Sequence, residues 1–94
     1  MSDAPDPKRE AFEREALVHI DAVYRFALRL SGDPEQANDL VQETFLRAWK
    51  AWDQYESGTR AKSWLFTICR NVFLRQVERG RRHRDTVEER APRE

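Results

Sequence analysis

The sequence contains one cysteine, three glycines and no long run of apolar residues, and each scarcity excludes a class of protein. A single cysteine cannot form an internal disulfide framework and does not indicate a metal cluster. No segment has the apolar length of a membrane-spanning helix, and none resembles a secretory signal. We therefore expect a cytoplasmic protein. Cys69 lies among Trp64, Leu65, Ile68 and Val72, so we interpret it as a small buried hydrophobe and not as a reactive thiol.

Catalytic and cofactor-binding patterns are also missing. The two histidines, His19 and His83, are far apart in sequence, and neither has another potential ligand at metal-binding spacing. There is no glycine-rich phosphate-binding loop. We expect no enzymatic activity, no cofactor and no bound metal.

The charges are numerous and unevenly distributed. The 94 residues suit one small domain, and their formal net charge is zero. Residues 1–43 carry ten acids and five bases, whereas residues 44–84 carry ten bases and three acids. The last ten residues carry four acids and two bases. An acidic front and a basic back predict two different partners, and the basic part favours phosphate groups.

Apolar spacing predicts helices and no strands. We expect a first helix from about Lys8 to Leu30, ended by Gly32, and a second from Pro34 to about Trp52. Asp33 is a suitable N-cap for the second helix, and Gln36 completes a capping-box spacing. A polar loop then precedes a third helix from about Arg60 to Arg79, for which Thr59 is a plausible N-cap and which Gly80 weakens. The predicted fold is all-α, a small three-helix bundle with or without a short extra helical turn.

The ends of the chain have a different composition from the helical part. Residues 1–7 hold two prolines, two acids and little that could pack. We expect residues 1–9 to be a disordered leader, residues 10–84 to be the helical domain, and residues 85–94 to begin a linker.

The second predicted helix has two contrasting faces. Its apolar stripe comprises Leu40, Val41, Phe45, Ala48 and Trp49. The other side carries Asp39, Gln42, Glu43 and Leu46. Acids around one exposed leucine suit docking onto a basic protein surface, although a solvated outer face gives the same pattern.

The third predicted helix is apolar on two nearly opposite sides. Ala61, Trp64, Leu65, Ile68 and Val72 form one face, and Phe66, Phe73, Leu74 and Val77 form the other. Such a helix either lies at the centre of a bundle or presents one face to a partner. We expect the second face to be only partly covered in so short a chain.

Basic, polar and aromatic residues are interleaved from the second helix to the end of the third, a pattern typical of nucleic-acid binding. The candidates are Arg47, Tyr55, Glu56, Lys62, Arg70, Asn71, Arg75, Arg79, Arg81 and Arg82, with Lys50 nearby. Arginine binds phosphates, asparagine can contact a base edge, and an aromatic ring can stack on an unpaired base. The structural alternatives are that Tyr55 packs the loop onto the core, that Asn71 holds a structural hydrogen bond, and that the arginines form a solvated helix end.

Two motifs resemble a known family. Residues 39–49, Asp-Leu-Val-Gln-Glu-Thr-Phe-Leu-Arg-Ala-Trp, and residues 64–71, Trp-Leu-Phe-Thr-Ile-Cys-Arg-Asn, are similar to region 2 of bacterial sigma factors, most closely the extracytoplasmic function (ECF) group. The resemblance spans roughly residues 10–84. It implies a transcription initiation domain that docks on RNA polymerase, recognises the promoter minus-ten element and holds the non-template strand open.

The resemblance also implies roles for individual residues. Asp39, Gln42 and Glu43 match the surface that docks on the clamp helices of the beta-prime subunit, in agreement with the acidic face. Tyr55 matches a loop aromatic that captures a flipped minus-ten base, Asn71 a helix position facing that base, and Arg47 a basic position near the promoter backbone. The family also implies an anti-sigma partner, for which Phe66, Phe73, Leu74 and Val77 are the candidate docking residues.

Two departures and two alternatives accompany this interpretation. Primary sigma factors carry adjacent tryptophans at positions matching Thr67 and Ile68, so their melting mechanism is not transferred. The helix-turn-helix module of the family is absent, and we expect an isolated domain of a longer factor that binds DNA weakly.

One alternative is a sigma-mimicking decoy, which binds an anti-sigma factor but not a promoter and needs no basic third helix. The other is a general helical DNA-binding module, which needs no acidic docking face.

Overall fold

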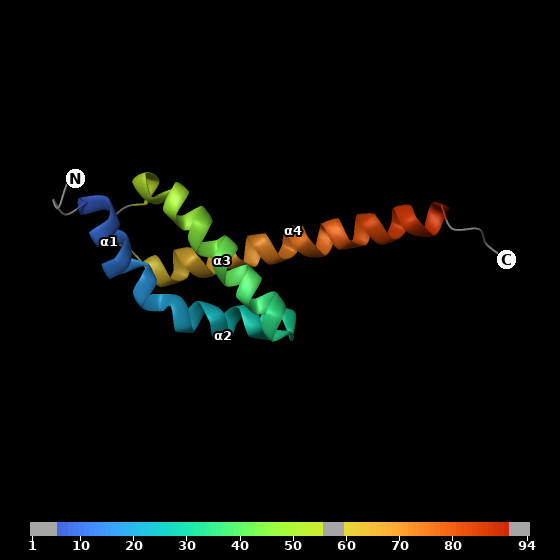
Figure 1. The fold of residues 1–94 in the computed structure, drawn as a ribbon, viewed down its shortest axis with the longest axis horizontal. Coiled ribbons are helices and arrows are strands. Elements are labelled where there is room, and N and C mark those ends of the chain that lie inside the picture. The colour runs from blue at the N-terminus through green and yellow to red at the C-terminus, as the bar shows by residue number, and fades with distance from the viewer. Residues whose placement is uncertain (1–5, 56–59, 91–94) are drawn as a thin grey trace, which may run out of the picture.

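The computed structural model describes residues 6–55 and 60–90, and in these residues every regular element is a helix. The order is α1 (Pro7–Glu15), η1 (Leu17–His19), α2 (Ile20–Ser31), α3 (Pro34–Lys50), η2 (Trp52–Gln54) and α4 (Ala61–Arg90), where η denotes a 3-10 helix (Figure 1). The predicted all-α bundle is confirmed. Glu56 and Thr59, two residues of interest in the loop before α4, lie outside the described residues.

The expected first helix is two helices, so the prediction of one continuous helix from Lys8 to Leu30 is wrong. The 3-10 turn Leu17–His19 interrupts it, and the chain changes direction between α1 and α2 (Figure 1). Phe12, Ala16, Val23 and Ala27 are all buried, and their spacing of four, seven and four is that of an unbroken helix. Because the break preserves this register, apolar periodicity could not reveal it.

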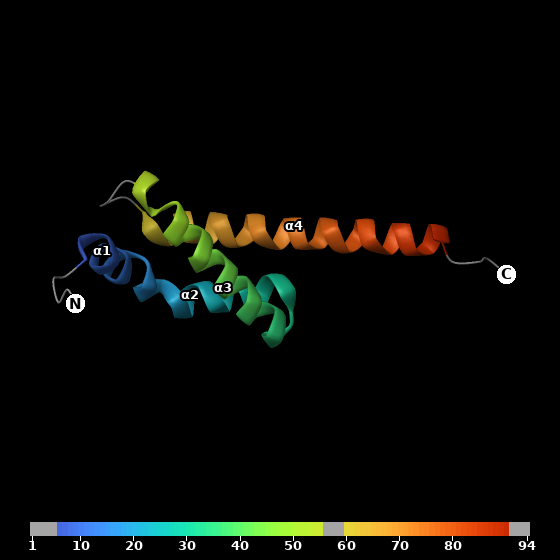
Figure 2. The same ribbon diagram turned by 45° about the horizontal axis from the view of Figure 1, so that its top comes forward.

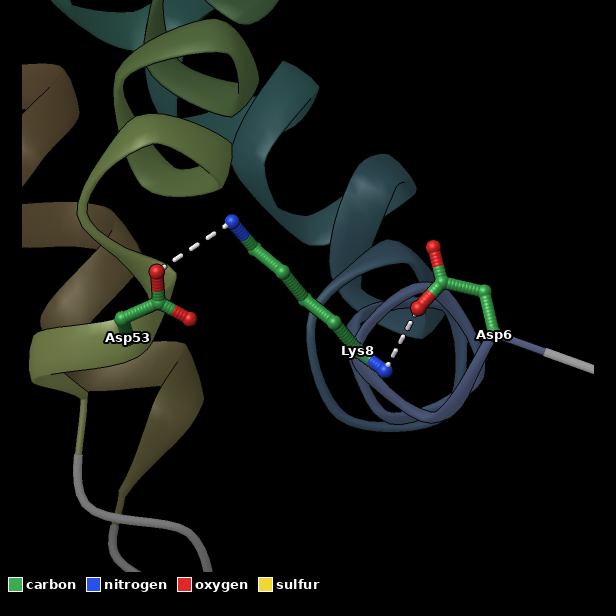
Figure 3. Close-up of polar contacts among 3 residues, drawn as sticks. All are labelled: Asp6, Lys8 and Asp53. Atoms are coloured by element: carbon green, nitrogen blue, oxygen red, sulfur yellow. Dashed lines mark hydrogen bonds and ion pairs between the residues drawn. The ribbon is translucent and has the colours of Figure 1, made fainter.

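Helix α1 begins within the expected leader. Asp6 accepts a hydrogen bond from the backbone N–H of Lys8 at 3.0 Å, and Pro7 occupies the first helical turn. Residues 7–9 are therefore helical, while residues 1–5 lie outside the described residues. Lys8 extends toward η2, where its Nζ lies 3.5 Å from Asp53 Oδ2 (Figure 3). The same Nζ lies 4.5 Å from the centre of the Trp49 ring. These contacts attach α1 to the end of α3.

The junction between α2 and α3 forms as expected. Gly32 takes the left-handed conformation at φ 70°, and its N–H bonds to the carbonyl of Leu28. Asp33 caps α3 by accepting a hydrogen bond from the Gln36 N–H at 3.2 Å. Only this half of the capping box is present, because the Asp33 N–H bonds to Ser31 Oγ instead. The α-helix ends at Lys50, slightly before the predicted Trp52, and η2 follows.

The core lies where α3 crosses α2 and α4. Helix α3 packs on both of these helices, and α2 also packs on α4. Leu40, Thr44 and Ala48 of α3 and Leu65 and Cys69 of α4 are fully buried. The Phe12 ring of α1 makes edge contacts with the rings of Phe45, Trp49 and Trp52, which closes one end of the bundle. The predicted apolar stripe of α3 therefore faces inward, although Val41 and Trp49 are only partly buried.

Helix α4 is longer than predicted. It spans 30 residues, about 45 Å, and its C-terminal half extends beyond the other helices (Figures 1 and 2). The helix passes through Gly80, where an added Cβ atom would meet nothing within 4 Å beyond the helix's own backbone. Residues 85–90 of the expected linker belong to this helix, and residues 91–94 lie outside the described residues.

Candidate functional site

The acidic face of α3 is exposed. Asp39, Gln42 and Leu46 are exposed, with 48% of Leu46 accessible, and Glu43 is half-buried. They lie opposite the buried Leu40, Thr44 and Ala48, as the helical spacing predicts. An exposed leucine among acidic and amide groups can bind a basic surface that offers a small apolar pocket.

Arg47 also lies on α3, one turn after Glu43. Its Nε donates a hydrogen bond to Glu43 Oε1 at 2.8 Å, and both side chains are a little over one third exposed. The ion pair thus connects the acidic face to the groove between α3 and α4. Because water reaches both groups, the pair contributes only about 0.3–0.5 kcal/mol to stability.

A pocket of about 210 Å³ lies between the end of α3 and the middle of α4. Its apolar wall is formed by Ala51, Trp64, Ile68 and Val72, and its polar lining by Arg47, Asn71 and Arg75. The Asn71 side chain is exposed and has no hydrogen-bond partner among the side chains that the structure describes, those of residues 6–55 and 60–80. The structural hydrogen bond considered for Asn71 is therefore not formed within this part of the chain, and its amide is available to a ligand.

A second hollow, of about 260 Å³, continues along the same groove. Its lining is Asp39, Glu43, Arg47, Val72, Arg75, Gln76 and Arg79. Acids from α3 face arginines from α4 here. The candidate DNA-binding residues Arg47, Asn71, Arg75 and Arg79 are thus brought together in one continuous groove. Gln76 was not predicted, although its position one turn after Val72 could have placed it on this face.

Tyr55 lies in a different place from Asn71. Its ring stacks on Trp52 at 4.7 Å between centroids and contacts Trp64 at 4.8 Å. Tyr55 thus packs the end of η2 onto the core, as its structural interpretation predicted. It also lines a hollow of about 480 Å³, which it shares with Lys62, Arg60, Arg14 and His19. Arg14 and His19 were not predicted here, because they come from the last turn of α1 and from η1, far in sequence from Tyr55 and Lys62.

The remaining basic candidates are distributed along α4. Lys62 is exposed, with its Nζ 5.7 Å from the centre of the Phe66 ring. Arg70 is exposed and lines none of these three hollows. Arg81 and Arg82 belong to α4, but the structure describes only their backbone. Glu56 lies outside the described residues.

The second apolar face of α4 is partly covered, as expected. Phe66 stacks on Phe26 of α2, and Phe73 is half-buried against the core. Leu74 and Val77 remain 46% and 37% exposed. The four candidate anti-sigma residues are therefore divided: two pack within the bundle and two face solvent.

Cys69 is buried between the helices, and burial raises the pKa of its thiol because the thiolate would be poorly solvated. A hydrogen bond with Thr44 opposes this rise in pKa. The Thr44 hydroxyl also donates to the Leu40 carbonyl at 2.6 Å.

Among the described residues, no group of three or more His, Cys, Asp or Glu side chains could hold a metal ion. Within the same ranges, no helix combines the length and apolar character needed to cross a membrane.

Comparison with known proteins decides the family. A family model for Sigma-70 region 2 matches residues 17–83, which is more than half of the chain. The chain belongs to the Sigma-70 region 2 family. The family includes relatives named as ECF sigma factors, so the ECF resemblance of the two sequence motifs is confirmed.

Several individual relatives are similar in sequence to this Sigma-70 region 2 chain over most of its length. ECF RNA polymerase sigma factor EcfG of Rhodopseudomonas palustris is 38% identical over 76 residues, covering 81% of this chain and 42% of the relative. ECF RNA polymerase sigma factor SigL of Mycobacterium tuberculosis is 44% identical over 70 residues, covering 73% and 39%. The chain spans less than half the length of these curated relatives.

A solved structure has the same fold. The sigma factor RpoE from Bartonella quintana, determined in complex with the anti-sigma factor NepR, superimposes on this region 2 chain with a TM-score of 0.73 and 41% sequence identity. The match covers 84% of this chain and 50% of that one.

Proposed function

We propose that this domain acts in transcription initiation, binding RNA polymerase through α3 and the promoter minus-ten element through the groove between α3 and α4. The observation that supports this most strongly is the proximity of two surfaces of opposite character. The exposed acidic face of α3 borders a groove lined by Arg47, Arg75 and Arg79, in a chain of the Sigma-70 region 2 family. A polymerase- and DNA-binding domain would work in the cytoplasm and would need no catalytic residues.

The polymerase contact is assigned to Asp39, Gln42, Glu43 and Leu46. Two carboxylates steer a basic partner, the Gln42 amide adds hydrogen bonds, and the exposed Leu46 supplies an apolar anchor. The proposed partner is the pair of clamp helices in the beta-prime subunit. Neither a DNA-binding module nor a solvated helix face requires this combination of residues.

The DNA contact is assigned to the pocket of the α3–α4 groove that contains Asn71 and, in addition, to the hollow lined by Tyr55 and Lys62. Trp64 lines the pocket that holds Asn71 and also contacts the ring of Tyr55, whereas Tyr55 does not line that pocket. We infer that Asn71, Arg47 and Arg75 bind one nucleotide of the non-template strand and that Tyr55 and Lys62 bind a neighbouring one. Glu56, Arg70, Arg79, Arg81 and Arg82 complete the proposed DNA-binding set. Unstacking a base costs a few kcal/mol, which stacking and phosphate contacts offset.

An anti-sigma factor is a further proposed partner. The structural neighbour RpoE was determined with the anti-sigma factor NepR, and this chain exposes Leu74 and Val77 on α4. Phe66 and Phe73 would support that surface from within the bundle. Anti-sigma binding that survives Leu74→Ser plus Val77→Ser, in a folded variant, would remove this assignment.

The first experiment is binding of the chain to the isolated beta-prime clamp helices. We expect wild type to bind and the variant Gln42→Ala plus Glu43→Lys to lose binding, because the variant removes the amide and reverses one charge. A matched control is Glu35→Lys with Asn38→Ala, which alters the same helix outside the proposed contact set. If folded wild type does not bind, the decoy and the general DNA-binding module become the better explanations.

A further inference from the structure

Glu43 and Arg47 belong to different proposed surfaces and bind each other. Glu43 lies on the acidic face proposed for the polymerase, and Arg47 lies in the groove proposed for DNA. The Arg47 Nε to Glu43 Oε1 distance of 2.8 Å means that, in the free chain, each group partly neutralises the other. Each residue therefore has an internal competitor for its external partner.

We propose that this ion pair couples the two binding events: a cationic polymerase side chain that pairs with Glu43 releases Arg47 to bind a DNA phosphate. The inference rests on the proposed function. It assigns Glu43 a second role, as a positioning residue that restrains Arg47 until the polymerase is bound.

The position of Arg47 makes such an exchange possible. Arg47 lines both hollows of the α3–α4 groove, the one with Asp39 and Glu43 and the one with Asn71. A guanidinium released from Glu43 remains beside the pocket that contains Asn71 and Arg75. An unpaired Arg47 would then contribute its full charge to a phosphate bound there.

The exposure of the pair makes the exchange easy. The Glu43 and Arg47 side chains are 38% and 37% exposed, so water screens their attraction. An exposed pair separated by four residues shifts an equilibrium by only about twofold. A partner guanidinium can therefore displace Arg47, whereas it could not displace an arginine from a fully buried pair.

Coupling of this kind is reciprocal. If polymerase binding at Glu43 strengthens DNA binding at Arg47, then DNA binding strengthens polymerase binding by the same factor. Asp39 lies in the same hollow as Glu43 and repels a phosphate through space, but no ion pair joins it to Arg47. Asp39 therefore serves as a matched control for charge alone.

The test measures binding of the 94-residue chain to a fluorescently labelled single-stranded DNA of mixed sequence at low ionic strength. We expect Glu43→Gln to bind about twofold or more tightly than wild type, because Arg47 loses its competitor. We expect Asp39→Asn to have a smaller effect. In the Arg47→Gln background, Glu43→Gln should give only the small increase that Asp39→Asn gives. Circular dichroism verifies that each variant is folded.

Adding the isolated clamp helices tests the coupling directly. At a concentration of clamp helices that saturates both proteins, they should raise the DNA affinity of wild type and have a smaller effect on Glu43→Gln, in which Arg47 is already released. The coupling is overturned if Glu43→Gln and Asp39→Asn strengthen DNA binding equally, or if the Glu43→Gln effect persists in full without Arg47. A folded wild type that binds DNA but shows either result leaves the proposed function intact. A folded wild type that binds no DNA overturns both.

Discussion

Phe66 of α4 stacks face to face on Phe26 of α2, with ring centroids 4.5 Å apart and ring planes 4° apart. This contact uses part of the second apolar face of α4 inside the domain. The exposed remainder, Leu74 and Val77, lies two to three turns further along the helix. The second apolar face of α4 thus has two parts: Phe66 stabilises the fold, and Leu74 and Val77 remain exposed for the proposed anti-sigma binding.

The division predicts different effects of substitutions along that face. Phe66→Ala should lower the free energy of unfolding by about 2–3 kcal/mol, somewhat less than for a fully buried phenylalanine, because Phe66 is only half-buried. Leu74→Ala, the matched control, should change it by less than about 0.5–1 kcal/mol. Urea unfolding followed by circular dichroism measures both. Equal losses would mean that Leu74 is packed in solution.

Gly32 and Gly80 should respond in opposite directions to the same substitution. Gly32→Ala should destabilise the domain by about 1–2 kcal/mol, because Gly32 holds a φ of 70° that alanine disfavours. Gly80→Ala should raise helicity, because Gly80 lies inside α4 with open space around it and alanine favours a helix interior by about 1 kcal/mol. Thermal unfolding and far-UV circular dichroism measure the two effects. A loss of helicity in Gly80→Ala would contradict the helical course of α4 there.

Cys69 should make stability depend on alkaline pH. Burial raises the pKa of the thiol in the folded state above that in the unfolded chain, about 8.5. Above that pH the unfolded chain releases the proton while the folded chain retains it, so stability falls as the pH rises. Cys69→Ala should be less stable throughout, because it leaves a small cavity, but should show a weaker decline between neutral and alkaline pH. Urea unfolding across this range measures the difference, and parallel declines would exclude Cys69 as the cause.

The arginines of the α3–α4 groove should determine the salt dependence of DNA binding. Arg75→Ala should weaken binding to single-stranded DNA and reduce the slope of log affinity against log salt by about 0.7, the value for one phosphate contact. Arg29→Ala, an exposed arginine of α2 that lines neither hollow of the groove, should leave the slope unchanged. Fluorescence titrations at several salt concentrations measure the slopes. Equal reductions for both variants would indicate binding to net charge and not to the groove.

Asn71 should affect base preference more than overall affinity. Its amide is exposed beside the apolar wall of Trp64 and Ile68, where it can contact a base edge. Asn71→Ala should reduce discrimination among oligonucleotides with different bases, by about 1–3 kcal/mol at the preferred position, while the salt slope stays unchanged. Competition among such oligonucleotides measures this. A variant that loses salt dependence instead would show that Asn71 acts through the phosphate backbone.

Local features of the amino-acid sequence determined much of this domain. The succession Gly32, Asp33 and Pro34 ended one helix and began the next, because left-handed backbone, capping and fixed φ depend only on residues within one turn. Helical spacing placed Asp39, Gln42 and Leu46 outside and Leu40, Ala48 and Leu65 inside. The burial of Cys69 followed from its apolar neighbours.

Tertiary structure decided what depends on contacts between separate helices. The 3-10 turn at Leu17–His19 redirects the chain while leaving the apolar register intact, so apolar periodicity does not predict it. Phe26 covers Phe66 because α2 lies beside that part of α4. The meeting of Arg47 with Asn71 and Arg75 depends on how α3 crosses α4. Tyr55 packs on Trp52 and Trp64 instead and does not line that pocket. Spacing along one helix cannot specify the position of another helix, because that position results from packing over the whole core.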